Sequence, residues 1–312
     1  MNVLSLFDGI SCGQLALNRV GIKIDNYYAS EIKKYAIKVT QKHFPNTIQI
    51  GDVTKVNYKD GILYTENGDF KAGKIDLLIG GSPCQNFSIA RACMYEIDGL
   101  KGDKSKLFYE YLRILKEVKP NYFLLENVKM KKESYEELNN YLGVKGILID
   151  SQLVSFQKRP RIYWCNIPNI TIPEDKNINF QDYKDTDYDY CSQFKVKRTT
   201  SRERMWNNGQ GRNNEIRSCD NITNSNKIYC LTRKQDRCPN SGLIEFDDFC
   251  RYLTRKEIEL AQTLPIGYTD DLSYGQMQDV CGDGWTVDVI AHILKGLKGD
   301  WDLWILKNVQ AK

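Results

Sequence analysis

The sequence predicts an α/β fold built on a mixed, mostly parallel sheet. Two observations support this prediction. Short apolar, β-prone runs recur along the first half of the chain, and several of them end in glycine or in an acidic residue. Between the runs lie segments whose apolar residues have helical spacing, as in residues 104–115. Strands that alternate with helices are typical of parallel sheets, whose ligand sites lie at the carboxyl ends of the strands.

The first strand, residues 3–7, runs into a glycine turn and then a helix. The turn covers residues 8–13 and has the sequence DGISCG. A strand, a glycine turn and a helix together are suited to bind a nucleotide-like ligand at the helix N-terminus. Because Gly9 and Gly13 are the only glycines here, the GxGxxG pattern that cradles a pyrophosphate is incomplete.

Two further strand ends carry acidic residues. Glu31 lies about 20 residues after the turn, where an acid commonly binds ribose hydroxyls; the alternative is a solvated carboxylate at a helix start. Asp52 follows a third strand, where it can accept from an adenine amine while Val53 packs on the ring; alternatively, Asp52 caps the next segment. Together these strand ends suggest an adenosine-bearing cofactor without a pyrophosphate, and S-adenosylmethionine fits that description.

A buried strand at residues 75–79 runs directly into Gly80-Gly81-Ser82-Pro83-Cys84. Pro83 fixes the backbone just before Cys84, and a thiol held rigidly at a strand end is a candidate nucleophile. The alternative is a buried structural cysteine. The polar, glycine-flanked segment 86–102 is suited to close over a substrate as a lid.

A carboxylate and a basic turn follow. Glu126 ends the strand at residues 122–125, beside the cysteine strand, and is a candidate acid or base. In the turn before the strand at residues 162–164, Arg159 and Arg161 project the same way if the chain is extended. They would then face a phosphate or a buried carboxylate, and a plain basic surface is the alternative.

Composition divides the chain into three parts: residues 1–168, 169–248 and 249–312. Residues 195–237 carry eleven Lys and Arg and four Asp and Glu, a local balance of +7, and are dense in Asn and Gln. These side chains contact phosphates and base edges. A solvated linker would also be polar, but it would rarely contain Trp206 or Leu231, so nucleic-acid contact is favoured. In the last part, Thr254 and Glu257 predict a capping box at a helix start.

Composition also excludes several classes of protein. The 312 residues contain no run of about 18 apolar residues and no secretory signal pattern, which predicts a cytoplasmic protein without a membrane span. Ten cysteines are then expected to be reduced thiols. With two histidines and no CxxC pair, no metal site is expected.

These motifs, in this order, resemble those of the DNA (cytosine-5) methyltransferases, which implies a Rossmann-like S-adenosylmethionine-dependent methyltransferase fold with a small, loop-rich target-recognition domain at 169–248. The resemblance implies a catalytic set of Cys84, Glu126, Arg159 and Arg161. The implied cofactor-binding residues are Phe7, Asp8, Gly9, Ile10, Ser11, Cys12, Glu31, Asp52, Val53, Pro83, Leu107, Asp283, Gly284 and Trp285. The implied substrate-binding residues are Gln85, Ser88, Arg91, Asn127, Arg233 and Lys234.

The chain departs from most bacterial members of that family at two places. Ser11-Cys12 stands where they carry two glycines, and residues 282–287 replace their last, GNAV-like motif. Both departures are similar to the vertebrate de novo branch. The resemblance therefore implies a compact prokaryotic or phage enzyme with that type of cofactor pocket.

The resemblance implies methyl transfer from S-adenosylmethionine to carbon 5 of cytosine in double-stranded DNA, through a covalent cysteine adduct on a flipped base. No obligatory protein partner is evident, and a cognate restriction endonuclease is one candidate. Two alternatives stay open: an RNA (tRNA) cytosine-5 methyltransferase, whose Cys-Phe-Thr element is not found here, and a non-catalytic DNA-binding regulator. The sequence does not identify the DNA target or the base that removes the carbon-5 proton.

Overall fold

A computed structural model describes residues 1–82, 106–197, 199–200, 221–235, 241–246 and 248–298. The chain divides into two compact units. Unit 1 consists of Met1–Ile149, Pro160–Ile172 and Val287–Lys312, and unit 2 of Asp150–Arg159 and Pro173–Thr286. The third part predicted from the sequence, 249–312, is therefore divided between the two units.

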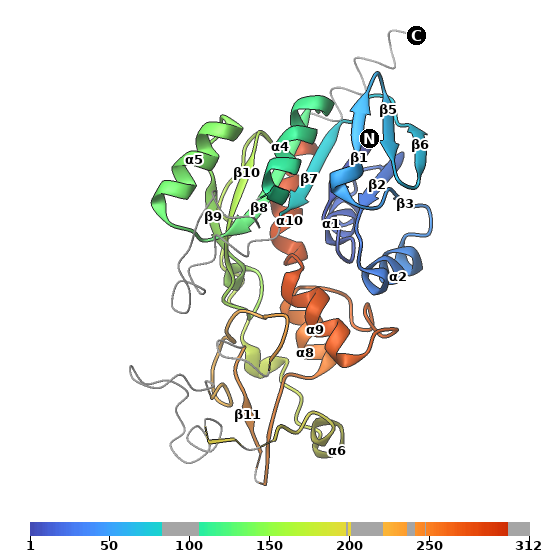
Figure 1. Ribbon diagram of the computed structural model, residues 1–312. Coiled ribbons are helices and arrows are strands. Elements are labelled where there is room, and N and C mark those ends of the chain that lie inside the picture. The colour runs from blue at the N-terminus through green and yellow to red at the C-terminus, as the bar shows by residue number, and fades with distance from the viewer. Residues whose placement is uncertain (83–105, 198, 201–220, 236–240, 247, 299–312) are drawn as a thin grey trace. The chain divides into compact units, whose positions relative to one another are not determined.

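Unit 1 is built on a seven-stranded sheet (Figure 1), which confirms the predicted mixed, mostly parallel architecture. The strand order is β3-β2-β1-β7-β8-β10-β9. The pairs from β3 to β8 are parallel, and β10 runs antiparallel to β8. The strands are β1 (Asn2–Leu6), β2 (Asn26–Ser30), β3 (Ile48–Gln49), β7 (Leu77–Gly81), β8 (Tyr122–Val128), β9 (Ile147–Asp150) and β10 (Pro160–Cys165).

Helices from both ends of the chain complete unit 1. They are α1 (Cys12–Val20), α2 (Lys34–His43), α4 (Lys106–Val118), α5 (Lys132–Leu142) and α10 (Val287–Leu294). Helices α1 and α10 pack against each other (Figure 1). Arg19 of α1 forms an ion pair with Asp288 of α10 at 2.6 Å. Apolar side chains of β1, β7, β8 and α4 form the main core cluster, so burial at this sheet fixes the positions of the strand ends.

A small antiparallel sheet inside unit 1 was not predicted. Strands β4 (Asn57–Lys59), β5 (Ile62–Thr65) and β6 (Gly68–Lys71) pair in that order. Asp60 and Gly61 connect the first two strands with φ values of 50° and 81°. Two positive φ values are what a type I′ hairpin turn requires, and Asp-Gly is a preferred pair for it. That dipeptide is the signal that could have revealed the hairpin.

Unit 2 consists of short elements joined by long loops. Its helices are η4 (Ser151–Leu153), η5 (Phe180–Asp182), α6 (Tyr188–Ser192), α8 (Arg255–Ala261) and α9 (Tyr274–Asp283), and its strands are β11 (Ile244–Glu245) and β12 (Cys250–Arg251). The predicted capping box of Thr254 and Glu257 is confirmed at the start of α8.

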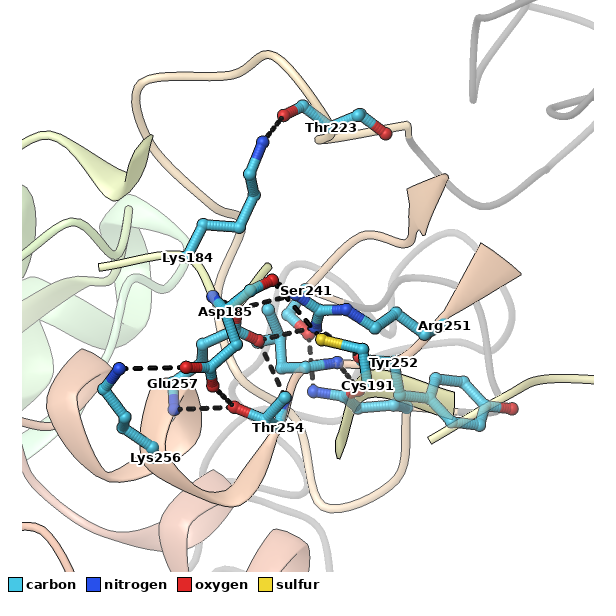
Figure 2. A network of polar contacts seen from close by, with 12 residues as sticks. Lys184, Asp185, Cys191, Thr223, Ser241, Arg251, Tyr252, Thr254, Lys256 and Glu257 are labelled. Carbon is cyan, nitrogen blue, oxygen red and sulfur yellow. Dashed lines mark hydrogen bonds and ion pairs between the residues drawn. The ribbon is translucent and has the colours of Figure 1, made fainter. Parts of the chain in front are cut away.

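A buried polar network connects α8 with the segment before α6 (Figure 2). Arg251 and Glu257, both with fully buried side chains, form a double hydrogen bond of 2.7 and 2.9 Å. Asp185 accepts from Thr254 and, at 2.9 Å, from Lys256, and its backbone carbonyl accepts from Arg251. These polar bonds join segments that are about 70 residues apart in the sequence.

Candidate active site

The turn after β1 has an unusual backbone. Phe7, Gly9 and Ser11 all have positive φ, between 57° and 62°. Such values are strained for residues other than glycine, and strain of this kind persists only where surrounding contacts hold it. A Cβ placed on Gly9 would meet no atom within 4 Å, so there is open space beside this residue. The strain and the space together mark the turn as a candidate ligand site.

Asp8 holds the turn from inside. Its carboxylate accepts from the Ser11 hydroxyl at 2.6 Å and from the Tyr27 hydroxyl at 2.8 Å, while its backbone N–H donates to Ser30. Burial raises the pKa of Asp8, and the hydrogen bonds from hydroxyl groups oppose that increase. Both carboxylate oxygens are thus used by the protein, which indicates that Asp8 shapes the turn.

Glu31 connects the same turn to the end of β2. Its Oε2 accepts from the Gly9 N–H at 2.9 Å, and its Oε1 accepts from the N–H groups of Ile32 and Lys33, both at 2.8 Å. A carboxylate oxygen can accept more than one hydrogen bond, so capacity for a ligand hydroxyl remains. The side chain is therefore held in place by backbone donors.

At the end of β3, Asp52 caps the short helix η1 (Val53–Lys55), as the alternative interpretation predicted. Its Oδ1 accepts from the N–H and the hydroxyl of Thr54, both at 2.9 Å. Val53 is 4% exposed and belongs to the main core cluster. Glu66, from the turn between β5 and β6, accepts from the Asp52 N–H at 2.8 Å and from Lys55 at 2.6 Å. Sequence analysis missed Glu66 because the hairpin was not predicted.

The other residues predicted near the cofactor are mostly buried by protein. Ile10, Ser11 and Cys12 are at most 4% exposed. Phe7 and Leu107 are partly buried and pack against the main core cluster. These side chains therefore support the shape of the site through packing.

Glu126 and Arg161 form an ion pair with a distance of 3.0 Å between Oε1 and Nε. The residues opposite them in the β8–β10 ladder are Tyr163 and Val128, so the pair occupies diagonal positions on one face of the sheet. The two side chains are only 10% and 14% exposed. A largely desolvated guanidinium beside a carboxylate holds that carboxylate in a fixed orientation.

Asn127 lies on β8 next to Glu126 and is 1% exposed. Its amide donates to the Ser82 hydroxyl at 3.2 Å, and its own oxygen accepts from the Val128 N–H at 2.8 Å. Ser82 is the last described residue before Pro83, and its neighbour Gly81 pairs with Glu126 in the ladder. The structure thus gives Asn127 a role in fixing the exit of β7, whereas the sequence predicted contact with a substrate.

Arg159 differs from its predicted arrangement beside Arg161. Strand β10 begins at Pro160, so Arg159 lies outside the strand and within unit 2. Arg159 is only 2% exposed. Its guanidinium donates hydrogen bonds to the backbone carbonyls of Leu231, Gly282 and Gly284. These contacts replace the expected carboxylate or phosphate contact.

The remaining predicted residues fall in unit 2 or outside the described chain. Arg233 and Lys234 are exposed, and Arg233 is paired with Asp279 and, at 3.5 Å, with Asp283. Asp283 is exposed, while Gly284 and Trp285 are partly buried. The predicted nucleophile and its neighbours lie outside the described residues; they are Pro83, Cys84, Gln85, Ser88 and Arg91.

Three general features of the described residues concern metals, membranes and cysteines. Within the described ranges, no group of three or more His, Cys, Asp or Glu is arranged to hold a metal ion. No helix of this part of the chain has both the length and the apolar character needed to cross a bilayer. The described cysteines form no disulfide bonds with one another; they are Cys12, Cys165, Cys191, Cys230, Cys250 and Cys281.

Comparison with known sequences places this geometry in context. Residues 1–148 match the model of the C-5 cytosine-specific DNA methylase family. Orphan methyltransferase M.Rho11sI of Bacillus phage rho11s is 32% identical over 191 residues, which cover 56% of this chain and 35% of the relative. DNA (cytosine-5)-methyltransferase DRM2 of Arabidopsis thaliana is 39% identical over 124 residues, 38% of this chain and 19% of the relative. The chain thus aligns with about a third or less of each of these curated relatives.

Solved structures show a similar fold along the whole chain. The methyltransferase EhMeth of Entamoeba histolytica has a TM-score of 0.72 at 18% identity, covering 96% of this chain and 98% of that chain. The Dnmt2 methyltransferase of S. pombe has a TM-score of 0.66 at 19% identity, covering 95% and 98%. At such low identity the likeness establishes the fold alone.

Proposed function

Because residues 1–148 match the model of the C-5 cytosine-specific DNA methylase family, we propose that the chain transfers a methyl group from S-adenosylmethionine to carbon 5 of cytosine in double-stranded DNA. The observation that carries this proposal is the Glu126–Arg161 pair at 3.0 Å beside the exit of β7. That exit leads, three residues after Gly81, to Cys84. This chemistry needs a fixed carboxylate, a guanidinium and a thiol; the structure describes the first two, and the sequence supplies Cys84 shortly after β7.

The residues of the first three strand ends fit the methyl donor. The strained turn around Gly9 leaves open space and keeps its shape through Asp8, and Glu31 offers lone pairs to ribose hydroxyls. Asp52 uses Oδ1 as a cap, and its carboxylate retains acceptor capacity for an adenine amine. When bound, S-adenosylmethionine supplies an electrophilic methyl group on a sulfonium.

The proposed reaction begins with the Cys84 thiolate, which forms a bond to carbon 6 of the cytosine and moves the electrons of the 5,6 double bond toward carbon 5. Glu126 holds the ring nitrogen and the exocyclic amine, so that protonation of the ring accompanies the addition. Arg161 orients Glu126 and contacts the base carbonyl. Carbon 5 takes the methyl group, and the electrons of the broken sulfur–methyl bond stay on the sulfur of the donor. A base then removes the proton on carbon 5, the ring nitrogen gives up the proton that it gained, and the bond between carbon 6 and the cysteine sulfur breaks to restore the ring and the thiolate.

The target base cannot be reached inside a duplex, so the proposal includes its extrusion, which costs a few kcal/mol. The basic region 195–237 is the proposed site of DNA contact. Phosphate contacts by Lys and Arg would make binding fall steeply as salt increases. Two relatives are named orphan methyltransferases, which favours activity without a cognate restriction endonuclease.

Transfer of a tritiated methyl group to duplex DNA, followed by bisulfite sequencing, tests the proposal directly. Cys84→Ala is expected to abolish transfer while donor binding is retained, and turnover by this variant would refute the covalent scheme. Glu31→Ala is expected mainly to raise the KM for the donor, because its carboxylate is placed beside the turn. An unchanged KM would argue against ribose binding.

An RNA substrate is the second candidate. The stretch Cys230-Leu231-Thr232 differs only at its middle residue from the Cys-Phe-Thr element of the RNA branch. Arg159 donates hydrogen bonds to the Cys230 sulfur and the Leu231 carbonyl of this stretch. The same tritium assay with tRNA in place of DNA separates the two candidates. Labelling of tRNA with no labelling of DNA would replace the proposed substrate, and labelling of DNA alone would support it.

A further inference from the structure

The guanidinium of Arg159 connects two segments that are distant in sequence. Nη1 donates to the Leu231 carbonyl at 3.1 Å and to the Cys230 sulfur at 3.3 Å. Nη2 donates to the carbonyls of Gly282 and Gly284 at 2.9 and 2.8 Å. All of these residues belong to unit 2, so the connection lies inside one compact body.

The second segment is the C-terminal end of α9. The last carbonyls of a helix have no partner within the helix and carry partial negative charge. A buried cation with two donors directed at them stabilises the end of the helix and fixes the turn that follows. Arg159 therefore determines where the chain leaves α9, just before Trp285.

The two segments also touch directly. A Cβ on Gly282 would lie 2.4 Å from the Arg233 nitrogen and 2.4 Å from the Thr232 carbonyl carbon, so only glycine permits this approach. Arg233 adds an ion pair with Asp279 on α9 and a longer one, 3.5 Å, with Asp283. The backbone of residues 230–233 thus lies against the last turn of α9. A shift of either segment would therefore displace the other.

We propose that Arg159 is a positioning residue that couples segment 230–233 to segment 282–285. This inference rests on the proposed function: residues 230–233 belong to the basic region proposed to contact DNA, and Asp283, Gly284 and Trp285 are among the residues that the family resemblance implies for the methyl donor. Binding of the donor at one segment then orders the other for DNA, and DNA favours donor binding by the same factor, as linkage requires. A buried arginine that only stabilises the fold would give no such coupling.

Hydrogen exchange of the full chain, with and without S-adenosylhomocysteine as the probe, tests the coupling. In the natural chain the probe is expected to slow amide exchange in both 282–285 and 230–233. In Arg159→Lys, where one ammonium cannot bridge both segments, slowing at 282–285 is expected to persist. In the same variant, the slowing of amide exchange that the probe causes at 230–233 is expected to be about tenfold smaller. This magnitude corresponds to the loss of one hydrogen bond from a charged group.

Arg251→Lys provides the matched control, because Arg251 is also a buried arginine of unit 2 and its described partners are Glu257 and the carbonyls of Tyr252 and Asp185. This variant is expected to retain the full response at 230–233. The inference is overturned if Arg159→Lys keeps the full response, if Arg251→Lys loses it equally, or if the probe slows 282–285 alone in the natural chain.

Asp279→Asn is the second variant, for use if Arg159→Lys does not fold. It removes the ion pair between Arg233 and Asp279, which is the second connection between the two segments. The slowing of exchange at 230–233 is expected to decrease about twofold to threefold, and an unchanged response would overturn the inference. The exchange measurement needs no turnover. A chain that shows the coupled response but methylates no DNA would therefore refute the proposed function and not the coupling.

Discussion

Glu257→Gln is the most informative test of how unit 2 is held together. The substitution keeps the size of the side chain and removes its charge. In the natural chain each carboxylate oxygen accepts twice: Oε1 from Arg251 and the Asp185 N–H, and Oε2 from Arg251 and the Thr254 N–H, at 2.7–2.9 Å (Figure 2). Both side chains of the ion pair are fully buried.

The expected loss follows from these contacts. Glutamine has one accepting oxygen, so its amide nitrogen must face two donors that lose their partner. The Arg251 guanidinium then remains buried without a counter-charge, and breaking a buried pair on one side costs roughly 3–5 kcal/mol. Since a domain has about 5–15 kcal/mol of stability in total, unit 2 should lose a large part of its own.

Native-state hydrogen exchange of the α8 amides is the suitable assay, because it reports the opening of unit 2 itself. Glu110→Gln is the matched control: it breaks a partly exposed pair with Arg113 at 2.7 Å in unit 1 and is expected to cost under about 1 kcal/mol. A loss for Glu257→Gln as small as that of the control would refute the reasoning. Adding Arg251→Met to Glu257→Gln should recover part of the loss, because no buried charge remains unpaired.

Three further predictions concern unit 1. Burial raises the pKa of Asp8, so its protonation favours the folded state below the ordinary pKa of 3.8, and that contribution is lost as pH rises through the folded pKa. Asp8→Asn should therefore flatten the decrease of Tm with pH above the ordinary value, and an unchanged slope would contradict this. Asn127→Ala should release Ser82 and lower kcat about tenfold with the donor Kd unchanged, as measured by steady-state kinetics and calorimetry. Burial raises the pKa of Cys165 to about 12, so mass spectrometry at pH 8 should find its alkylation at least about a hundredfold slower than that of a free thiol.

The sheet could be predicted because its signals are local. The short apolar runs correspond to strands, and the residues that follow three neighbouring strands, Gly9, Glu31 and Asp52, do lie at one edge of the parallel sheet. The capping box of α8 was predictable for the same reason, since Thr254 and Glu257 are three residues apart. The Asp60-Gly61 hairpin carried an equally local signal that was overlooked.

The partners of the arginines could not be read from the sequence. Alternation predicts a shared direction for Arg159 and Arg161 only inside a strand, and Pro160 begins that strand. Arg161 then meets Glu126 across a ladder, while Arg159 binds carbonyls more than 70 residues away in sequence. Such contacts depend on how distant segments pack, which spacing along the chain does not encode. The same holds for Asn127. The family resemblance implied a contact with the substrate, whereas in the structure its amide donates to the Ser82 hydroxyl.

The chain passes four times between its two units, because 150–159 and 173–286 are inserted into the body formed by the remaining segments. Helix α10, which packs on α1, is therefore made by the ribosome only after all of unit 2. During synthesis the surface of α1 that α10 covers stays exposed until residues 287–294 have left the exit tunnel. Ending the chain before residue 287 should accordingly destabilise unit 1, although all strands of its large sheet precede that point, and separate expression of either unit would require joining segments that the gene keeps apart.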